Sequence, residues 1–181
     1  LAQREEGIEI EVIVVDDHSS DQGVERLQPY SHAITLLRSE GRGATAARNQ
    51  ALSHATGNWV QFLDADDYLK PGKIAAQLKE AGEAIDQAHV LYAPVLVEQW
   101  KNEEVVSTEP TRIREDFDIY ERWIAWQLPQ TGGALWRRQA LLDLGGWKPD
   151  QPCCQEHELY ARALRAGLSF RMTSQPRAVY R

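Results

Sequence analysis

The chain has 181 residues, of which 43% are hydrophobic and 26% charged, a balance typical of one globular domain with a sizeable core. Its net charge of −7 and isoelectric point of about 5.3 exclude a broad basic surface, so we expect no nucleic-acid partner. No apolar run reaches the roughly 18 residues of a membrane span and no signal-peptide pattern opens the chain, which indicates a cytoplasmic protein, free or peripheral to the inner face of the membrane.

The first hundred residues alternate short strands with helices. Runs rich in β-branched and aromatic residues predict strands, and alanine or leucine at helical spacing predicts helices. We expect strands at 11–15, 33–38 and 59–63, helices at 24–30, 43–55 and 71–85, and a strand pair at 89–100 and 104–108. Such alternation is typical of an α/β fold with a mostly parallel sheet flanked by helices.

Residues 101–181 have a different pattern and predict a smaller, mixed region. We expect a helix at 114–126, a strand at 132–138, a short helix at 138–146 and a long helix at 155–167. The two cysteines, Cys153 and Cys154, are adjacent, and neighbours rarely pair, so we expect reduced thiols. The chain begins without methionine and ends directly after a strand-like segment. We therefore expect a single domain over 1–181 that is truncated at both ends.

Acidic residues follow two of the predicted strands. The first strand leads into Asp16 and Asp17, and the strand at 59–63 leads into Asp64, Asp66 and Asp67. A single aspartate at such a place is usually a turn or helix-cap residue. Two clusters that meet at one edge of a parallel sheet instead favour a ligand site with a hard divalent cation. We expect Mg²⁺ or Mn²⁺, held chiefly by Asp66 and shared with a diphosphate.

A glycine-rich segment, "SEGRGATAARN" (39–49), lies between the two clusters. Its glycines allow close approach of a ligand to the backbone, and Arg42 and Arg48 supply positive charge. The stretch from Gly41 to Ala46 also matches the GxGxxA fingerprint of dinucleotide-binding sites. That fingerprint follows its strand at once, whereas three residues intervene here, so a nicotinamide cofactor is the less favoured interpretation.

Three motifs together resemble the family 2 glycosyltransferases, which have the GT-A fold. "EVIVVDDHSSD" resembles the family's strand and VDDGS element, "GRGATAARNQAL" its glycine-rich segment ending in ARN, and "FLDADDYLKPGKI" its DxD motif. The resemblance implies a nucleotide-binding half (1–100) and an acceptor or catalytic half (101–181). It also implies that Asp17 meets the base of the donor nucleotide, Arg48 shapes the nucleotide pocket, Asp64 reaches the ribose and Asp66 binds the metal.

The start of the helix at 155–167 resembles the family's ED-x-(D/E)-L element, which carries the catalytic base on its second acid. Glu156 occupies that position, with Gln155 in place of the first acid and glutamate in place of the usual aspartate. Acids also favour the first turn of any helix, which is the structural alternative for Glu156.

Gln130 and Thr131 resemble acceptor-side residues. Any of the four tryptophans of the second half either lines the acceptor site or belongs to the core.

The resemblance implies transfer of a sugar from a nucleoside-diphosphate sugar, UDP being the expected nucleotide, to an acceptor hydroxyl. The implied reaction is a metal-assisted inverting displacement with Glu156 as general base and a saccharide, lipid or other hydroxyl compound as acceptor. The family's first strand, which ends in a Pro-x-Tyr-Asn-like element, is missing from this chain. Two alternatives stay open: a non-catalytic nucleotide-sugar-binding or scaffolding domain of a longer protein, and a nucleotidyltransferase.

Overall fold

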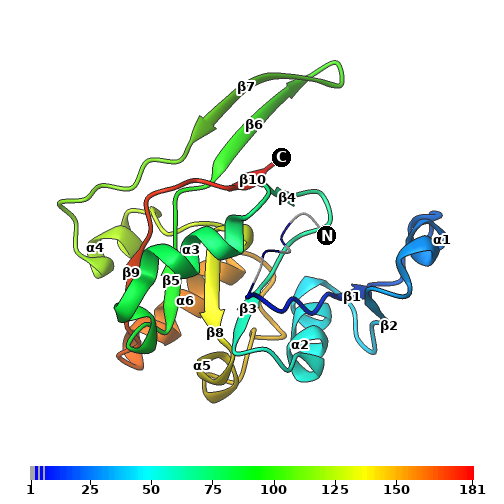
Figure 1. Cartoon of the computed structure of the whole chain (residues 1–181), viewed down its shortest axis with the longest axis horizontal. Coiled ribbons are helices and arrows are strands. Elements are labelled where there is room, and N and C mark those ends of the chain that lie inside the picture. The colour runs from blue at the N-terminus through cyan, green and yellow to red at the C-terminus, as the bar shows by residue number, and fades with distance from the viewer. Residues whose placement is uncertain (1–2, 4, 6) are drawn as a thin grey trace.

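A computed structural model of the chain describes residues 3, 5 and 7–181. Figure 1 shows a layered body with a strand pair at one side and a long hairpin that projects from it. The strands are β1 (Ile13–Asp16), β2 (Thr35–Arg38), β3 (Trp59–Gln61), β4 (Tyr68–Leu69), β5 (Val90–Tyr92), β6 (Leu96–Lys101), β7 (Glu104–Pro110), β8 (Ala134–Arg137), β9 (Phe170–Met172) and β10 (Ala178–Tyr180). The helices are α1 (Gly23–Leu27), η1 (Gln28–Tyr30), α2 (Ala44–His54), α3 (Lys73–Ala81), η2 (Gly82–Asp86), α4 (Ile119–Ile124), η3 (Thr131–Gly133), α5 (Arg138–Asp143) and α6 (Gln155–Arg165).

The strands form three sheets, in the orders β1-β2, β4-β10-β6-β7 and β3-β8-β5-β9. In the last of these, β5 and β9 are parallel, and β8 lies antiparallel between β3 and β5. The expected α/β class is confirmed. The expected common strand direction holds for β3, β5 and β9, and β8 from the second half of the chain makes this central sheet mixed.

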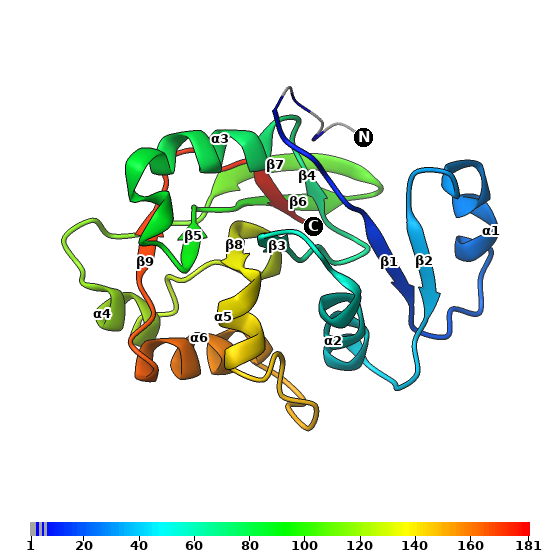
Figure 2. The same ribbon diagram turned by 60° about the horizontal axis from the view of Figure 1, so that its bottom comes forward.

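The two faces of the central sheet are buried against different helices, as Figure 2 shows. Because side chains alternate along a strand, Val90 and Tyr92 point to one face and Leu91 to the other. The first face packs against α5 and α6 in a cluster that includes Leu141 and Leu159. The second face packs against α3 and η2 through Ile74, Leu78 and Ile85, which lie on the apolar stripe expected for that helix.

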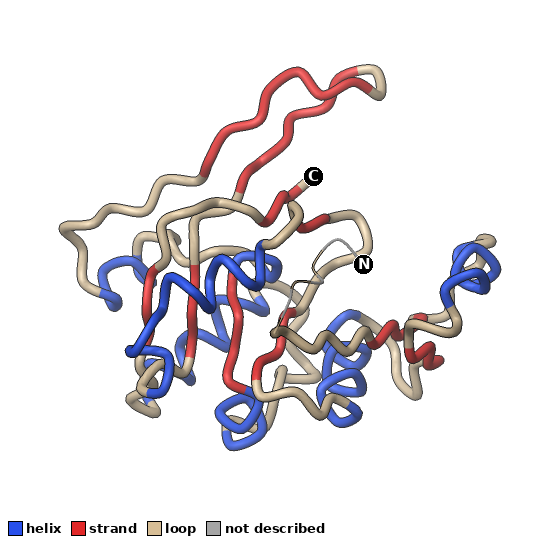
Figure 3. The backbone as a smooth tube through the Cα atoms, viewed as in Figure 1, coloured by secondary structure: helices blue, strands red, loops and turns tan. Residues whose placement is uncertain are grey.

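The strand expected at 89–100 is two strands, and this part of the prediction is wrong. β5 ends at Tyr92 and β6 begins at Leu96, in different sheets. Pro94 lies between them and has no N–H to donate to a sheet ladder, so the chain changes direction there. The adjacent Val95 is buried, and its backbone exchanges hydrogen bonds with Thr111. β6 then pairs with β7 in the projecting hairpin (Figure 3).

The helix expected at 114–126 is shorter in the structure. α4 begins after Asp118, whose side chain accepts a hydrogen bond from the backbone N–H of Glu121, while the Glu121 carboxylate accepts from the N–H of Asp118. This capping box fixes the start of the helix.

The thiols of Cys153 and Cys154 are free and exposed, just before α6. No helix in the described part of the chain has both the length and the apolar character needed to cross a membrane.

Candidate active site

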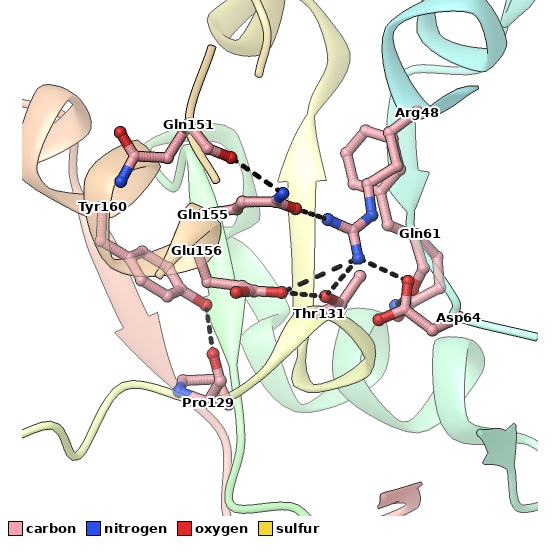
Figure 4. Close-up of polar contacts among 10 residues, drawn as sticks. Arg48, Gln61, Asp64, Pro129, Thr131, Gln151, Gln155, Glu156 and Tyr160 are labelled. Carbon is pink, nitrogen blue, oxygen red and sulfur yellow. Dashed lines mark hydrogen bonds and ion pairs between the residues drawn. The ribbon is translucent and has the colours of Figure 1, made fainter. Parts of the chain in front are cut away.

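Arg48 lies on the second turn of α2 and connects segments that are distant in sequence (Figure 4). Its guanidinium donates to three side chains: Asp64 Oδ1 at 2.5 Å, Gln155 Oε1 at 2.9 Å and Thr131 Oγ1 at 3.3 Å. Only 11% of the Arg48 side chain is exposed. A partly buried guanidinium with three fixed acceptors is held rigidly, because its planar fork matches their positions.

The next residue, Asn49, fixes the surface on which Arg48 rests. The Asn49 side-chain amide donates to Trp147 O and accepts from Trp147 N, both at 2.7 Å. The guanidinium carbon of Arg48 lies 4.5 Å from the centre of the Trp147 ring. A side chain at Gly146 would bring its Cβ within 2.5 Å of Asn49 Oδ1, so glycine is required there. The ARN motif therefore supplies both the cation and the residue that orients its aromatic support.

Glu156 lies in the first turn of α6 and faces the same centre. The hydroxyl of Thr131 donates to Glu156 Oε1, and Arg48 Nη2 lies 3.9 Å from the same oxygen. The side chain of Glu156 is 28% exposed, so its carboxylate is oriented by protein groups but open to solvent. Gln155, at the position of the family's first acid, donates to Gln151 O at 3.1 Å and keeps its amide oxygen for Arg48.

Thr131 is held in place by the segment that precedes it. The phenol of Tyr160, which is buried on α6, donates to Pro129 O at 3.1 Å. Burial, with a smaller contribution from the nearby Glu156 charge, raises the pKa of Tyr160 well above its ordinary value, so it remains a donor. Gly133 N donates to Gln130 O at 2.9 Å and closes the turn η3. Gln130 itself is exposed, whereas Thr131 is 4% exposed and faces the site.

Asp17 lies just after β1 and contacts the start of α2. Its carboxylate accepts a hydrogen bond of 2.8 Å from Gly43 N, and the ring of His18 lies 3.1 Å from Gly41 O. Gly43 has a φ of +88°, a conformation that favours glycine. Asp17 is exposed and binds one end of α2, while Asp64 binds Arg48 one turn further along. The ends of β1 and β3 therefore meet on the same helix.

Asp64, Asp66 and Asp67 form a tight turn after β3. The backbone N–H of Asp67 donates to Asp64 O at 3.2 Å, and its carboxylate accepts from Arg181 N at 3.1 Å. Burial raises the pKa of Asp67, and the charges of Asp66 and Asp64 raise it further. Asp66 is exposed. Within residues 3, 5 and 7–181, no group of three or more histidine, cysteine or acidic side chains is arranged to hold a metal ion.

The turn is nevertheless compatible with a divalent cation. Mg²⁺ and its relatives are often bound by one or two carboxylates together with the phosphates of a substrate, rather than by a complete protein cage. Asp64 is bound to Arg48, and Asp67 accepts from the Arg181 backbone, which leaves the exposed Asp66 as the candidate ligand. Burial is the main cause of the raised pKa of Asp67, and the smaller contributions of the Asp66 and Asp64 charges are a repulsion that a cation would relieve.

Beneath η3 lies a buried polar cluster that sequence patterns did not single out. Lys73, in the first turn of α3, is 1% exposed, and its ammonium donates to Gln61 Oε1. Gln61 in turn donates to Gly132 O at 3.1 Å, and the buried Gln77 donates to Thr173 Oγ1 at 3.2 Å. Burial lowers the pKa of Lys73 to about 7. A lysine at a helix start is usually solvated, so no local signal could have found this one.

The structure brings three of the five predicted site residues into one contact network: Arg48, Asp64 and Glu156. Asp17 follows β1 and Asp66 lies in the turn after β3, and neither is among the residues that Arg48 contacts. Sequence reasoning missed the roles of Gln155, Asn49 and Trp147. For Asn49, its place in the ARN motif was the available signal.

Comparison with known proteins gives consistent matches to one family. The profile described as Glycosyl transferase family 2 matches residues 1–145. An uncharacterized glycosyltransferase of Nostoc sp. is 31% identical over 140 residues, which cover 74% of this chain and 43% of that protein. Poly(ribitol-phosphate) beta-N-acetylglucosaminyltransferase TarS of Staphylococcus aureus is 38% identical over 85 residues, 45% of this chain and 14% of TarS. The chain thus spans less than half the length of these relatives.

Solved structures agree with the sequence matches. The S. aureus TarS 1-349 structure in complex with UDP has a TM-score of 0.65 at 22% identity, covering 94% of this chain and 50% of that one. The mannosyltransferase PcManGT from Pyrobaculum calidifontis, in complex with GDP-Man and Mn²⁺, has a TM-score of 0.65 at 23% identity, covering 94% of this chain and 47% of that one. At these identities the likeness shows a shared fold, the GT-A-like architecture of these glycosyltransferases.

Proposed function

The chain belongs to glycosyl transferase family 2, and on that premise we propose that it transfers a sugar from a nucleoside-diphosphate sugar to an acceptor hydroxyl. The proposal rests on one observation above all. Arg48 joins Asp64, at the end of a strand of the nucleotide-binding half, to Glu156, at the start of the principal helix of the other half. The carboxylates that we assign to the donor and to the acceptor therefore lie in one contact network, which supports a transfer between two substrates.

On the donor side, the candidate residues are Asp17, Arg48 and Asp64. Asp17 is an exposed acceptor for the nucleotide base, and Asp64 has a second carboxylate oxygen available for a ribose hydroxyl. Arg48 fixes the orientation of Asp64. That the related TarS and PcManGT structures contain UDP and GDP-Man supports a nucleoside diphosphate as the leaving group.

Asp66 is the residue that would hold Mn²⁺ or Mg²⁺. A divalent cation supplies charge stabilisation for a leaving diphosphate. The exposed carboxylate of Asp66 in a crowded acidic turn supports this assignment, as does the Mn²⁺ in the PcManGT complex. Asp64 is bound by Arg48 and Asp67 by the Arg181 backbone N–H, which leaves the carboxylate of Asp66 available for the metal.

On the acceptor side, Glu156 is the candidate general base of an inverting displacement. The Thr131 hydroxyl and Arg48 orient Oε1, and a partly exposed carboxylate is able to take a proton from an incoming hydroxyl. The acceptor is a saccharide, a lipid or another hydroxyl compound.

Two measurements test the proposal. Calorimetry with UDP and with GDP, each with and without Mn²⁺, should give metal-dependent binding of one of them. Release of that nucleoside diphosphate from its sugar donors should then accelerate when a hydroxyl acceptor is added. Binding without acceptor-dependent release would favour a non-catalytic binding domain, and pyrophosphate release from a nucleoside triphosphate would favour a nucleotidyltransferase. Absence of any nucleotide binding would contradict all three.

A further inference from the structure

Trp126 is held rigidly in an exposed position directly after α4. Its side chain is 64% exposed, and its φ of +56° is one that non-glycine residues rarely adopt. Backbone bonds maintain this conformation: Trp126 N donates to Trp123 O at 3.1 Å, and Gln127 N donates to Arg122 O at 2.8 Å. These two bonds and the positive φ form the Schellman motif that ends α4, with Trp126 as the residue after the cap, so the helix end holds the exposed ring in a fixed position.

The ring of Trp126 completes a three-ring stack. The imidazole of His157 lies 4.0 Å from Trp126 with an interplanar angle of 7°, and 4.7 Å from Trp123 with an angle of 15°. One face of an imidazole is too small for two indoles side by side, so the two tryptophans lie on opposite faces of His157. Trp123 Nε1 also donates to His157 O at 3.0 Å, which anchors the inner ring. The outer face of Trp126 is therefore the exposed end of a supported stack.

This stack and the candidate active site share helix α6. His157 directly follows Glu156 on α6, and α4 packs beside α6 in both Figure 1 and Figure 2. The segment after Trp126 runs along the same helix: Pro129 O accepts from Tyr160, and Thr131 donates to Glu156. A ligand whose hydroxyl reaches Glu156 would extend along this segment toward the indole.

We propose that the outer face of Trp126 is an acceptor subsite that stacks on a pyranose ring of a saccharide acceptor. This inference rests on the proposed function, because it names the acceptor class for the same site. A pyranose ring offers a flat face of C–H groups that matches an indole, while its hydroxyls remain solvated or reach polar protein groups. Tyr120 and Ile124 of α4 are exposed as well, but Trp126 is the ring that His157 holds flat, and a flat ring matches the C–H face of a sugar.

The local charge argues against a membrane as the occupant. Segment 112–126 carries three arginines and four acids, namely Arg112, Arg114, Arg122, Glu115, Asp116, Asp118 and Glu121. Attraction to anionic lipid needs a cluster of basic residues, which this balance does not provide. A neutral sugar ring needs no such charge.

The test uses the full chain labelled with 5-fluorotryptophan and followed by ¹⁹F NMR. Trp126→Phe and Trp100→Phe assign two resonances; Trp100, on the projecting hairpin, is 43% exposed and serves as the matched control. Methyl glycosides and disaccharides of glucose, galactose, mannose and N-acetylglucosamine are added in the presence of UDP and Mn²⁺, with acyclic ribitol as the polyol without a ring. At least one pyranoside should shift the Trp126 resonance, while ribitol leaves it unchanged and no sugar shifts that of Trp100.

Trp126→Ala should weaken binding of that pyranoside by about tenfold, the scale of an aromatic stack, and Trp126→Phe should restore part of it. The affinity for UDP, measured by calorimetry on the same samples, should not change in either variant. The inference is overturned if no pyranoside shifts Trp126, if ribitol or Trp100 responds equally, or if Trp126→Ala abolishes binding to phosphatidylglycerol vesicles instead. Absence of both UDP and GDP binding in the unaltered chain would reject the proposed function, whereas intact nucleotide binding without a sugar response rejects the subsite alone.

Discussion

Arg48 and Asp64 form an ion pair with an N–O distance of 2.5 Å, although they lie on a helix and on a loop after a strand. The same guanidinium nitrogen lies 3.9 Å from Glu156. One cation thus sets the orientation of two carboxylates with different proposed roles, and it would couple the two sides of the proposed reaction.

Replacing Arg48 by methionine should therefore damage more than one contact. Asp64, Gln155 and Thr131 each lose a charge-assisted hydrogen bond, so the free energy of unfolding should fall by about 1–3 kcal/mol in urea denaturation. UDP affinity should fall as well, because Asp64 is no longer held. Arg48→Lys keeps the charge without the planar fork and should recover stability only in part. Unchanged stability in Arg48→Met would contradict the linking role.

Glu156→Gln tests the proposed general base. The amide oxygen still accepts from Thr131, so the local structure and UDP affinity should be preserved, while turnover falls by about 10²-fold or more. Glu25→Gln is the matched control, because Glu25 is also a glutamate in the first turn of a helix, α1, and is exposed. Its turnover should stay near that of the unaltered chain. Near-normal turnover in Glu156→Gln would remove this residue from the mechanism.

Asp66→Asn tests the proposed metal ligand. The substitution removes the exposed carboxylate of the acidic turn but keeps its size, so calorimetry should show UDP binding that no longer responds to Mn²⁺. EDTA should have the same effect on the unaltered chain. Asp86→Asn, at an exposed aspartate of η2, changes net charge equally and should leave the Mn²⁺ response intact. A normal Mn²⁺ response in Asp66→Asn would refute the assignment.

Local patterns predicted most elements because their causes are local. The β-branched run that ends in Asp16 and the alanine-rich spacing of α2 depend on neighbours in sequence, and both elements form as expected. The break at Pro94 was also readable, because proline lacks the N–H that a continuous strand would need there. The prediction of one long strand gave the apolar run more weight than this residue.

The contacts that assemble the site could not be read in the same way. Arg48 meets Thr131 and Gln155 across 83 and 107 residues of sequence. No periodicity encodes such pairings, and only the family resemblance brought Arg48 and Glu156 into one hypothesis. The burial of Lys73 could not be predicted for the same reason, because it follows from the packing of α3 against η3 and not from the neighbouring residues in sequence.

The two glycines of η3 should respond very differently to alanine. A Cβ at Gly133 would lie 2.4 Å from Pro129 Cβ and 2.7 Å from Val95 Cγ1, whereas one at Gly132 would meet its nearest neighbour, Ala178 Cβ, at 3.4 Å. Gly133→Ala should therefore lower the free energy of unfolding by about 1–3 kcal/mol and displace Thr131, while Gly132→Ala should be tolerated. Equal denaturation midpoints for the two variants would show that η3 is not tightly packed.

Lys73 should make stability depend on pH in a defined window. Burial lowers the pKa of Lys73 in the folded chain to about 7, from 10.5 in the unfolded chain. Between these values the unfolded state binds a proton that the folded state does not. The free energy of unfolding attributable to Lys73 should therefore rise with pH, by up to about 1.4 kcal/mol per pH unit, and be lost as pH falls from 10.5 toward 7.

Lys73→Met isolates this contribution. The methionine fills the same space without a titrating group. In urea denaturation between pH 7.5 and 9.5, the free energy of unfolding should therefore rise less steeply for the variant, and its gain in stability over the unaltered chain should be largest at pH 7.5. The Gln61 amide loses its partner at every pH, which lowers the free energy of unfolding of the variant by the same amount throughout and leaves its slope against pH unchanged. Lys79→Met, at an exposed position of the same helix, should leave the slope unchanged. Parallel curves for Lys73→Met and the unaltered chain would mean that Lys73 stays charged in the fold, compensated by its amide partner.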